Sequence, residues 1–152
     1  MNLEVLTTLG ALRRLEPEWR ELSLPTPMQS PSWLVSWWEA FGEEDPSYEL
    51  ATLAVRDADD RLVGLAPFYL RKQPIVGPTL RLLGDGRAST DHHTVLCRSP
   101  EDEPAVVRAV ADLKHHPLQG FRLLNRILRE KTLILVGQVP ENCARLKDWT
   151  VF

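Results

Sequence analysis

The residues whose types and spacing most suggest chemistry are Arg81 to Gly86, which read RLLGDG and match the pattern R-x-x-G-x-G. Such a loop binds a pyrophosphate when its backbone N–H groups open a helix, because the helix dipole adds to their attraction for the anion. Here residues 87–97 have the character of a loop followed by a strand, and Asp85 would place a negative charge against an anionic ligand. We therefore interpret the segment as a glycine turn that ends a strand, with pyrophosphate binding as the alternative.

A second group of polar residues, Asp91, His92 and His93, precedes Cys97. Adjacent histidines on a strand point to opposite faces, so they cannot both ligate one ion, and no metal site is expected. Asp91 and His92 could serve instead as a carboxylate and an imidazole in a cleft, since histidine titrates near neutral pH, although a solvated turn is the simpler interpretation. The candidate substrate-binding residues are Asp91 and His92 for the cleft and Arg81 for anion contact. No catalytic residue is identified.

The elements that must position these residues begin with a hairpin. YELATLAV (48–55) and RLVGLAPFYL (61–70) flank the polar stretch RDADD and predict two antiparallel strands. The second strand is apolar on both faces, which indicates that both of its sides are covered. Pro67 cannot donate to a ladder and predicts a bulge or a locally unpaired side. Further strands are expected within the ranges 2–7, 78–86, 92–97 and 132–137.

Residues 29–42 carry three of the five tryptophans and predict a helix. Ser30 is a suitable N-cap, Pro31 suits the first helical position, and Gly42 is placed to end the helix in a left-handed conformation. A broad apolar face follows from the helical spacing of Trp33, Leu34, Trp37, Trp38 and Phe41. This spacing favours packing in the core over an aromatic binding platform.

Three other helices are predicted. In the segment after Thr8, Pro17 predicts two short helical pieces or a kink, because it lacks the N–H that a helix interior requires. A helix after Ser99 has acidic residues in its first turn and a buried stripe that includes Val106. The basic pattern of residues 121–131 is better explained by a solvated helix face than by an acidic partner or a membrane surface.

Composition limits the classes of function. The 152 residues fit one domain, and 18 basic against 21 acidic side chains give a net charge of -3, so no positive field points to nucleic acid. The N-terminus lacks the features of a signal peptide, and no apolar run is long enough for a membrane span. The two cysteines have no metal-ligand spacing, and a cytoplasmic protein is expected.

The order of the segments is distinctive: LEPEWREL, QSPSWLVSWWEAF, LVGLAPFYL and LRLLGDGRASTDHHTVLC. Over residues 3–113 the chain resembles the N-terminal half of the CelD-like acetyltransferases, which are cellulose-biosynthesis-associated members of the GNAT superfamily related to the FemAB type. The resemblance implies an α/β (α+β) fold with a mixed, mostly antiparallel sheet and packed helices, in an incomplete tandem-GNAT protein. Residues 1–113 would be the N-terminal GNAT-like domain, and residues 114–152 a divergent tail from a truncated or frame-shifted continuation.

The same resemblance implies an N-acyltransferase that moves an acyl group from acetyl-CoA or another acyl-CoA to an amine. The acceptor is expected to be a small molecule or a precursor of a polysaccharide or of the cell envelope. In such proteins the acyl-CoA site belongs to the C-terminal half, so this short chain is expected to be impaired or inactive alone. A non-enzymatic binding module or a degenerate fragment is the alternative, and an apolar face without its second half could drive self-association.

Overall fold

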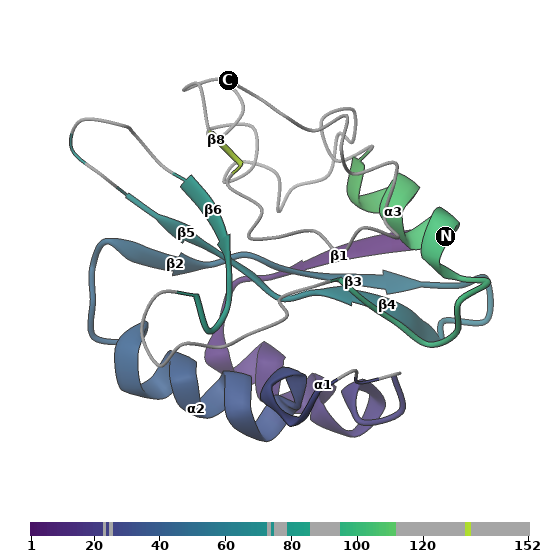
Figure 1. The fold of residues 1–152 in the computed structure, drawn as a ribbon, viewed down its shortest axis with the longest axis horizontal. Helices are drawn as coiled ribbons and strands as arrows, with labels where there is room; N and C mark the ends of the chain where they lie inside the picture. The colour runs from purple at the N-terminus through teal and green to yellow at the C-terminus, as the bar shows by residue number, and fades with distance from the viewer. Residues whose placement is uncertain are drawn as a thin grey trace.

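A long β-hairpin, interrupted in both of its strands, is the framework on which the other elements pack (Figure 1). The computed structural model describes residues 1–22, 24, 26–72, 74, 79–85, 95–111 and 133–134. Within these residues the helices are α1 (Leu9–Trp19), the 3-10 turn η1 (Pro27–Gln29), α2 (Pro31–Phe41) and α3 (Glu103–Ala111). The strands are β1 (Asn2–Leu6), β2 (Tyr48–Leu50), β3 (Thr52–Arg56), β4 (Leu62–Ala66), β5 (Phe68–Arg71), β6 (Thr79–Leu82), β7 (Leu96–Cys97) and β8 (Leu133–Ile134).

The strands form two four-stranded sheets that share the hairpin. Sheet A has the order β1-β3-β4-β7 and sheet B the order β2-β5-β6-β8, with every pair antiparallel except β6 and β8. β2 continues as β3 across Ala51, and β4 continues as β5 across Pro67. Because proline has no N–H for a ladder, Pro67 is a natural place for such a break. The hairpin and the interruption at Pro67 confirm the prediction from the sequence.

The third strand of the framework is divided at the same level. Leu82 of β6 pairs with Phe68, and Leu96 of β7 pairs with Leu65, so both halves run along one hairpin strand in the same direction. Between them the Leu83 N–H donates to the Pro67 carbonyl at 2.7 Å. Among the described residues, the chain is therefore bonded to the hairpin strand as far as Leu83 and is paired with that hairpin strand again at Leu96.

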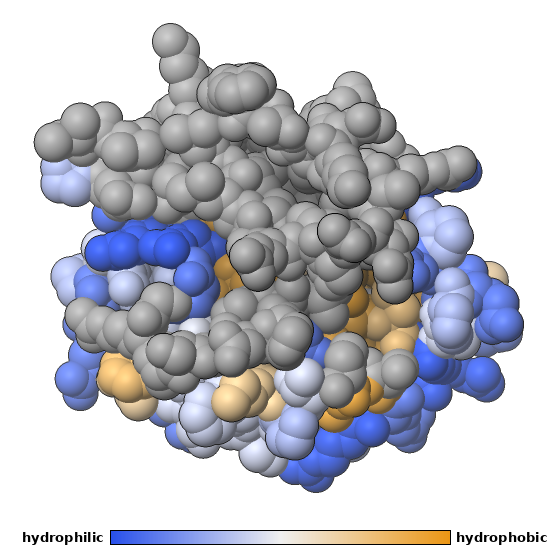
Figure 2. All heavy atoms as spheres, in the orientation of Figure 1, coloured by the Kyte–Doolittle hydropathy of each residue, from blue (hydrophilic) through white to orange (hydrophobic). Residues whose placement is uncertain are grey.

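Helices α1 and α2 lie on one face of the sheets, and α3 lies on the other face, over sheet A (Figure 1). In the same view the described hydrophobic residues lie toward the middle of the molecule and hydrophilic residues gather at its left and lower right margins (Figure 2). The buried residues form two hydrophobic clusters. One lies between the sheets and helices α1 and α2, and the other lies on the face that α3 covers. All five residues of β4 are buried, which confirms that this strand is covered on both sides. The mixed, mostly antiparallel sheets with packed helices confirm the predicted α/β (α+β) fold class.

Helix α3 approaches β4 so closely that position 64 requires glycine. A Cβ added to Gly64 would lie 2.4 Å from Val106 Cγ1, far inside any normal contact distance. Val106 is fully buried, as the apolar stripe of this helix predicted. Val106 therefore packs directly against the backbone of Gly64, where a larger residue would not fit.

Helix α2 begins as predicted, but its buried face is rotated from the predicted one. Ser30 Oγ accepts a hydrogen bond from the Trp33 N–H at 3.3 Å, and Pro31 is the first helical residue. Trp37 and Trp38 are buried, whereas the Trp33 side chain is 38% exposed. Val35 is buried instead, so the face that meets the sheet is centred further from Trp33 than the sequence pattern indicated.

The predicted left-handed end of α2 is wrong. Gly42 has φ -101° and ψ -39°, in the right-handed region, and its N–H donates to the Trp38 carbonyl at 2.7 Å. Glycine is required here for space, since a Cβ at Gly42 would lie 2.3 Å from Trp38 Cε3. The position of the Trp38 indole explains this glycine, and the backbone dihedrals do not.

Helix α1 runs without interruption through Pro17, so the alternative of two short helical pieces is wrong. Thr8 caps the helix, with its Oγ1 accepting from the Ala11 N–H at 3.2 Å. Pro17 lies near the C-terminal end of α1, where its missing N–H removes one hydrogen bond, the one to the Arg13 carbonyl. Leu12, Leu15 and Trp19 are the buried residues of α1.

Several predictions concern residues outside those that the structure describes. The basic pattern at 121–131, most of the strand expected at 92–97 and the division of the chain after residue 113 are among them, and they stay predictions. Within 132–137 the structure describes β8, which pairs with β6.

Candidate functional site

Tyr69 lies at the centre of an aromatic and polar cluster where α2, β2, β5 and β6 meet. Its side chain is 1% exposed. The centroid of its ring lies 5.4 Å from that of Trp37, 6.3 Å from that of Trp38 and 5.0 Å from that of Tyr48, in tilted or edge-on arrangements that aromatic rings favour. The name Tyr69 cluster is used here for Trp37, Trp38, Tyr48, Tyr69, Arg81 and Asp85.

Strand alternation places Tyr69 on the face of the sheet that α2 covers. Its neighbours Phe68 and Leu70 belong to the hydrophobic cluster on the opposite face. Arg81 is directly opposite Tyr69 in the register of β5 and β6, so its side chain emerges on the same face as Tyr69. A helix, two strands and a turn thus bring residues from distant parts of the sequence together.

Arg81 forms an ion pair with Asp85 across the turn that ends β6. The Asp85 Oδ2 atom lies 2.5 Å from Arg81 Nε, and the two side chains are 22% and 30% exposed for Arg81 and Asp85 respectively. Gly84 between them has φ 91°, a left-handed conformation that glycine adopts without strain, and the Asp85 N–H donates to the Leu82 carbonyl at 3.1 Å. Arg81 Nε is buried and has no hydrogen bond of good geometry, so Asp85 is its charged partner among the described residues.

The Tyr69 hydroxyl is held in its protonated form. The pKa of Tyr69 is raised to about 12, mainly by burial; Arg81 and Arg71 act to lower it, and Tyr48 and Asp85 act to raise it. A phenol in this state remains a hydrogen-bond donor at neutral pH. The cluster therefore combines a neutral donor, a cation and an anion on one side of the sheet.

The structure confirms that RLLGDG forms a glycine turn at the end of a strand. Arg81 and Leu82 belong to β6, and the turn follows at Leu83 and Gly84. Among the described residues no helix begins between Asp85 and Glu103. The helix N-terminus that a pyrophosphate loop requires is therefore not found in this part of the described chain.

The N-terminus of α3 is acidic, and the turn before it is held by Asp102. Asp102 Oδ2 accepts hydrogen bonds from the Ser99 N–H at 3.1 Å and from Ser99 Oγ at 2.9 Å. Glu101 and Glu103 add further negative charge around the first turn of this helix. Carboxylates at a helix N-terminus satisfy its dipole and repel a phosphate, so α3 is poorly suited to bind one.

Of the three candidate substrate-binding residues, the structure describes Arg81 alone. Asp91 and His92 lie outside the described residues, as does His93, and their grouping with Arg81 stays a prediction. Within the described ranges no three His, Cys, Asp or Glu side chains are grouped to hold a metal ion. Cys97, a half-buried residue of β7, is part of no such group.

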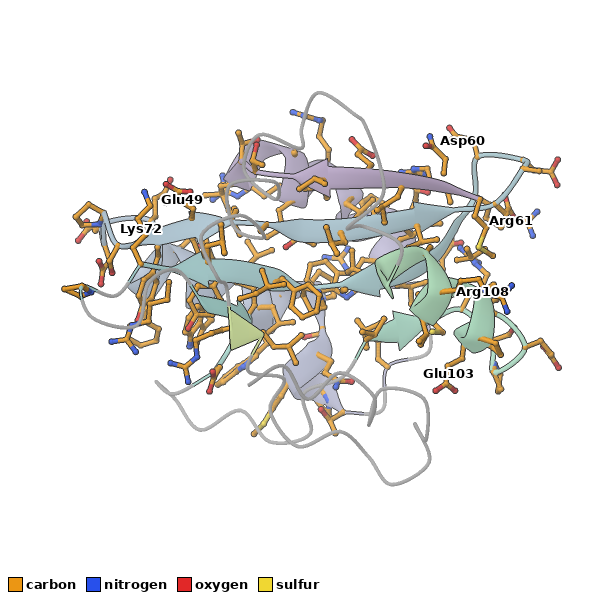
Figure 3. The ribbon with its side chains drawn as sticks, turned by 90° about the horizontal axis from the view of Figure 1, so that it is seen from above. Glu49, Asp60, Arg61, Lys72, Glu103 and Arg108 are labelled. Carbon is orange, nitrogen blue, oxygen red and sulfur yellow. The ribbon has the colours of Figure 1, made fainter. Side chains whose placement is uncertain are left out.

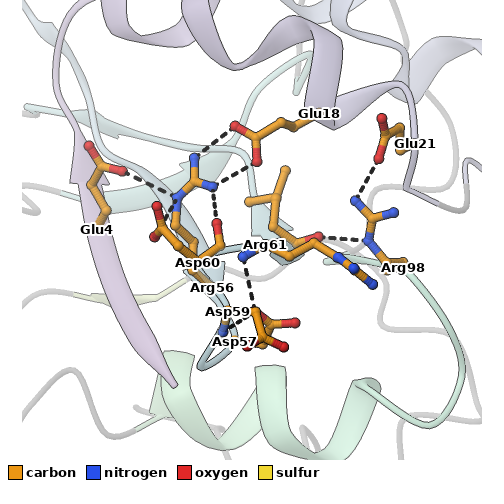
Figure 4. Close-up of polar contacts among 10 residues, drawn as sticks. Glu4, Glu18, Glu21, Arg56, Asp57, Asp59, Asp60, Arg61 and Arg98 are labelled. Carbon is orange, nitrogen blue, oxygen red and sulfur yellow. Dashed lines mark hydrogen bonds and ion pairs between the residues drawn. The ribbon is translucent and has the colours of Figure 1, made fainter.

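A second charged centre lies at the opposite end of the hairpin, around Arg56 (Figure 4). Its guanidinium donates to both carboxylate oxygens of Glu18, at 2.7 and 2.9 Å, and to the Asp60 carbonyl at 2.8 Å. Nearby, Arg98 donates to the Leu62 carbonyl and to Glu21, each at 2.9 Å. The Arg56 hydrogen bonds hold α1 and the β3–β4 turn together, so this centre is structural.

The margin of the Tyr69 cluster carries further charges. Arg71 lies over the ring of Tyr48 at 5.8 Å from its centroid, a cation–π contact. Lys72 forms an ion pair with Glu49 at the same end of the hairpin, far from Asp60 and Arg61 at the other end (Figure 3). Arg71 thus covers the ring of Tyr48 on the side of β2.

Reasoning from the sequence missed Tyr69 and the pairing of Arg81 with Asp85. The alternation of LAPFYL could have placed Tyr69 on one face, but the sequence does not show which face a helix covers. The spacing of Arg81 and Asp85 across a glycine turn was visible, yet it was used only to argue against an anionic ligand. Their contact depends on the left-handed turn at Gly84.

No family model and no curated protein matches the chain. Among solved structures, the chain is similar to a point mutant of spermidine N-acetyltransferase SpeG from Vibrio cholerae, with 14% sequence identity and a TM-score of 0.36 over 86% of this chain and 78% of that one. A similarity at this level does not assign a family.

Within the described residues no helix has both the length and the apolar character needed to cross a bilayer. The longest of these helices, α1 and α2, have 11 residues each, against roughly 20 in a membrane-spanning helix.

Proposed function

We propose that this chain is the N-terminal half of a CelD-like N-acyltransferase of the GNAT type and forms one wall of its substrate cleft. The observation that supports this most is that three segments of the resemblance converge on one residue. The tryptophan helix contacts Tyr69 through Trp37 and Trp38, Tyr69 itself belongs to the GLAPFYL strand, and Arg81 of the RLLGDG turn pairs opposite it. Segments separated by tens of residues thus form a single structural unit.

We infer that the interruption between β6 and β7 leaves room for the acceptor side of the proposed substrate cleft. In acyl transfer a base removes a proton from the amine, and backbone donors stabilise the oxyanion that forms from the thioester carbonyl. Among the described residues Ala66 has no register partner in β6 or β7, next to the Pro67 carbonyl that accepts from the Leu83 N–H. Asp91 and His92 lie between β6 and β7 in the sequence, and we assign them to the acceptor side of the cleft.

The acceptor is then an amine, as a small molecule or as a precursor of a polysaccharide or of the cell envelope, and the donor is acetyl-CoA or another acyl-CoA. Arg81 is the proposed contact for an anionic group of one of these ligands. A cytoplasmic location fits a reaction that depends on acyl-CoA. These assignments follow from the resemblance and from the placement of Arg81.

A non-enzymatic binding module is the second candidate, and one observation favours it. The N-terminus of α3, the helix that follows the RLLGDG segment, is acidic among the described residues and is poorly suited to the phosphates of CoA. In this case the Tyr69 cluster would serve only to stabilise a surface that a partner recognises.

Titration calorimetry with acetyl-CoA separates the two candidates. If the chain is an acyltransferase, we expect heat of binding at micromolar acetyl-CoA. We also expect release of the CoA thiol that depends on an added amino sugar or diamine. Glu49→Gln is a suitable control variant, because it alters an exposed ion pair with Lys72 away from Tyr69 and should bind as the wild type does. Heat of binding without thiol release would fit the impaired enzyme expected of an N-terminal half alone, and absence of both heat and thiol release would favour the binding module over the acyltransferase.

A further inference from the structure

Asp85 occupies the position at Arg81 that an external anion would take. Its Oδ2 atom lies 2.5 Å from Arg81 Nε. A guanidinium binds carboxylates and phosphates through the same planar N–H donors, so a side-chain carboxylate and an anionic group of a ligand compete for it. Arg81 Nε is buried without a hydrogen bond of good geometry, which leaves this donor poorly satisfied by Asp85 alone.

We propose that Asp85 masks Arg81 as an intramolecular competitor, and that an anionic ligand binds at Arg81 by displacing the Asp85 carboxylate. The inference rests on the proposed function only for the nature of the ligand, which would be an anionic group of the acyl donor or of the acceptor. The masking itself follows from the contact between the two side chains.

The surroundings of the pair allow such a displacement. Asp85 is anchored through its backbone, whose N–H donates to the Leu82 carbonyl, so its carboxylate can rotate away without unpairing β6. Arg81 is held opposite Tyr69 by the strand register and keeps its place when Asp85 leaves. The pair is partly exposed, and ion pairs of this kind are weak enough for a multivalent anion to replace them.

Arg56 is an arginine whose carboxylate partner an external anion could not easily displace. It is held by both oxygens of Glu18 and by a backbone carbonyl, and its side chain is 15% exposed. An anion would have to displace several partners at once from a more buried site. Arg56 is therefore fixed by several partners, whereas Arg81 is covered by the Asp85 carboxylate among the described residues.

Binding of inorganic pyrophosphate to the wild type and to Asp85→Asn tests the proposal. Removing the carboxylate frees the guanidinium and also removes a like charge beside the anion, so Asp85→Asn should bind pyrophosphate about tenfold more tightly. Glu49→Gln changes the net charge by the same amount on the same sheet and should leave the affinity unchanged. Adding Arg81→Gln to Asp85→Asn should abolish the gain.

A second measurement covers the case in which Asp85→Asn folds poorly. The Nε–H resonance of Arg81 in the wild-type protein should shift on addition of pyrophosphate, while that of Arg56 should not. Equal affinities of the wild type and Asp85→Asn, a gain that survives Arg81→Gln, or absence of pyrophosphate binding and of the resonance shift would each overturn the proposal. Pyrophosphate binding without acetyl-CoA binding would retain the masking and reject the proposed function.

Discussion

The two ends of the hairpin hold their arginines in different ways. At the sheet A end, Arg56 donates to two oxygens of Glu18 and to the Asp60 carbonyl, and Glu4 lies 4.0 Å away. At the sheet B end, Arg81 meets one carboxylate and keeps a buried donor without a well-formed hydrogen bond. A cation with several hydrogen bonds stabilises the fold, whereas one with a poorly satisfied donor is the better candidate to bind a ligand. The difference is the reason that the proposed anion contact is placed at Arg81 and not at Arg56.

The largest effect is expected from Tyr69→Ala. Removing a fully buried ring that contacts Trp37, Trp38 and Tyr48 should lower the free energy of unfolding by about 3–5 kcal/mol, as for other large aromatic residues in cores. Urea denaturation followed by tryptophan fluorescence measures this loss. Tyr69→Phe retains the ring and should lose less than about 1.5 kcal/mol, and an equal loss in both variants would show that the packing of the ring is unimportant.

Next in size is Gly64→Ala in sheet A. The added Cβ would lie 2.4 Å from Val106 Cγ1, so α3 must move or Val106 must change its conformation, at a cost of about 1–3 kcal/mol. Thermal unfolding of Gly64→Ala, Val106→Ala and the double variant forms a cycle in which the two changes should partly compensate. Gly10→Ala in α1 is the control, because a Cβ there meets only Arg14 Nη1 at 3.7 Å and should not destabilise the protein.

Replacement of Arg56 should have a smaller effect that depends on pH. The hydrogen bond from Arg56 is the main reason that the pKa of Glu18 lies below its ordinary value of 4.5. A carboxylate with a lowered pKa in the folded state stabilises the protein above its unfolded pKa, and this stabilisation is lost as the pH falls through the folded value. Arg56→Met should lower the free energy of unfolding at pH 7 by about 1–3 kcal/mol, since it breaks charge-assisted hydrogen bonds.

The pH profile distinguishes this ion pair from a mere packing effect. Wild-type stability should fall below about pH 4.5, and Arg56→Met should show a shallower fall over the same range. Denaturation midpoints between pH 7 and pH 2.5 provide the measurement. Parallel profiles for the two proteins would mean that Glu18 does not depend on Arg56.

The smallest change in stability is expected at the other arginine. Asp85→Asn should alter the free energy of unfolding by less than about 1 kcal/mol, because a partly exposed single ion pair contributes little. Its effect should appear in anion affinity instead. A loss of stability as large as that of Arg56→Met would make the Arg81–Asp85 pair structural and would remove the contrast between the two ends of the hairpin.

The sequence predicted the framework because its signals are local. The alternation of apolar residues around RDADD predicted the hairpin, and the missing N–H of Pro67 predicted its break. Ser30 and Pro31 predicted where α2 begins. Each of these features depends on a few neighbouring residues and on the properties of the backbone.

Contacts between distant residues could not be predicted in the same way. Gly42 and Gly64 are glycines because of the side chains of Trp38 and Val106, and neither relation is visible without the packed structure. The buried face of α2 includes Val35 in place of Trp33 because the orientation of the helix on the sheet decides it. Pairing of Arg81 with Asp85 likewise depends on the turn that Gly84 makes possible.

The divided third strand has a consequence for how this protein can vary in evolution. Leu83 and Leu96 are bound independently to neighbouring points of one strand, at Pro67 and Leu65. The register of β6 and β7 is therefore set without reference to the number of residues between them. Insertions and deletions between these two anchors should be tolerated by the sheet, so related proteins could change the length and chemistry of this segment while the fold stays the same.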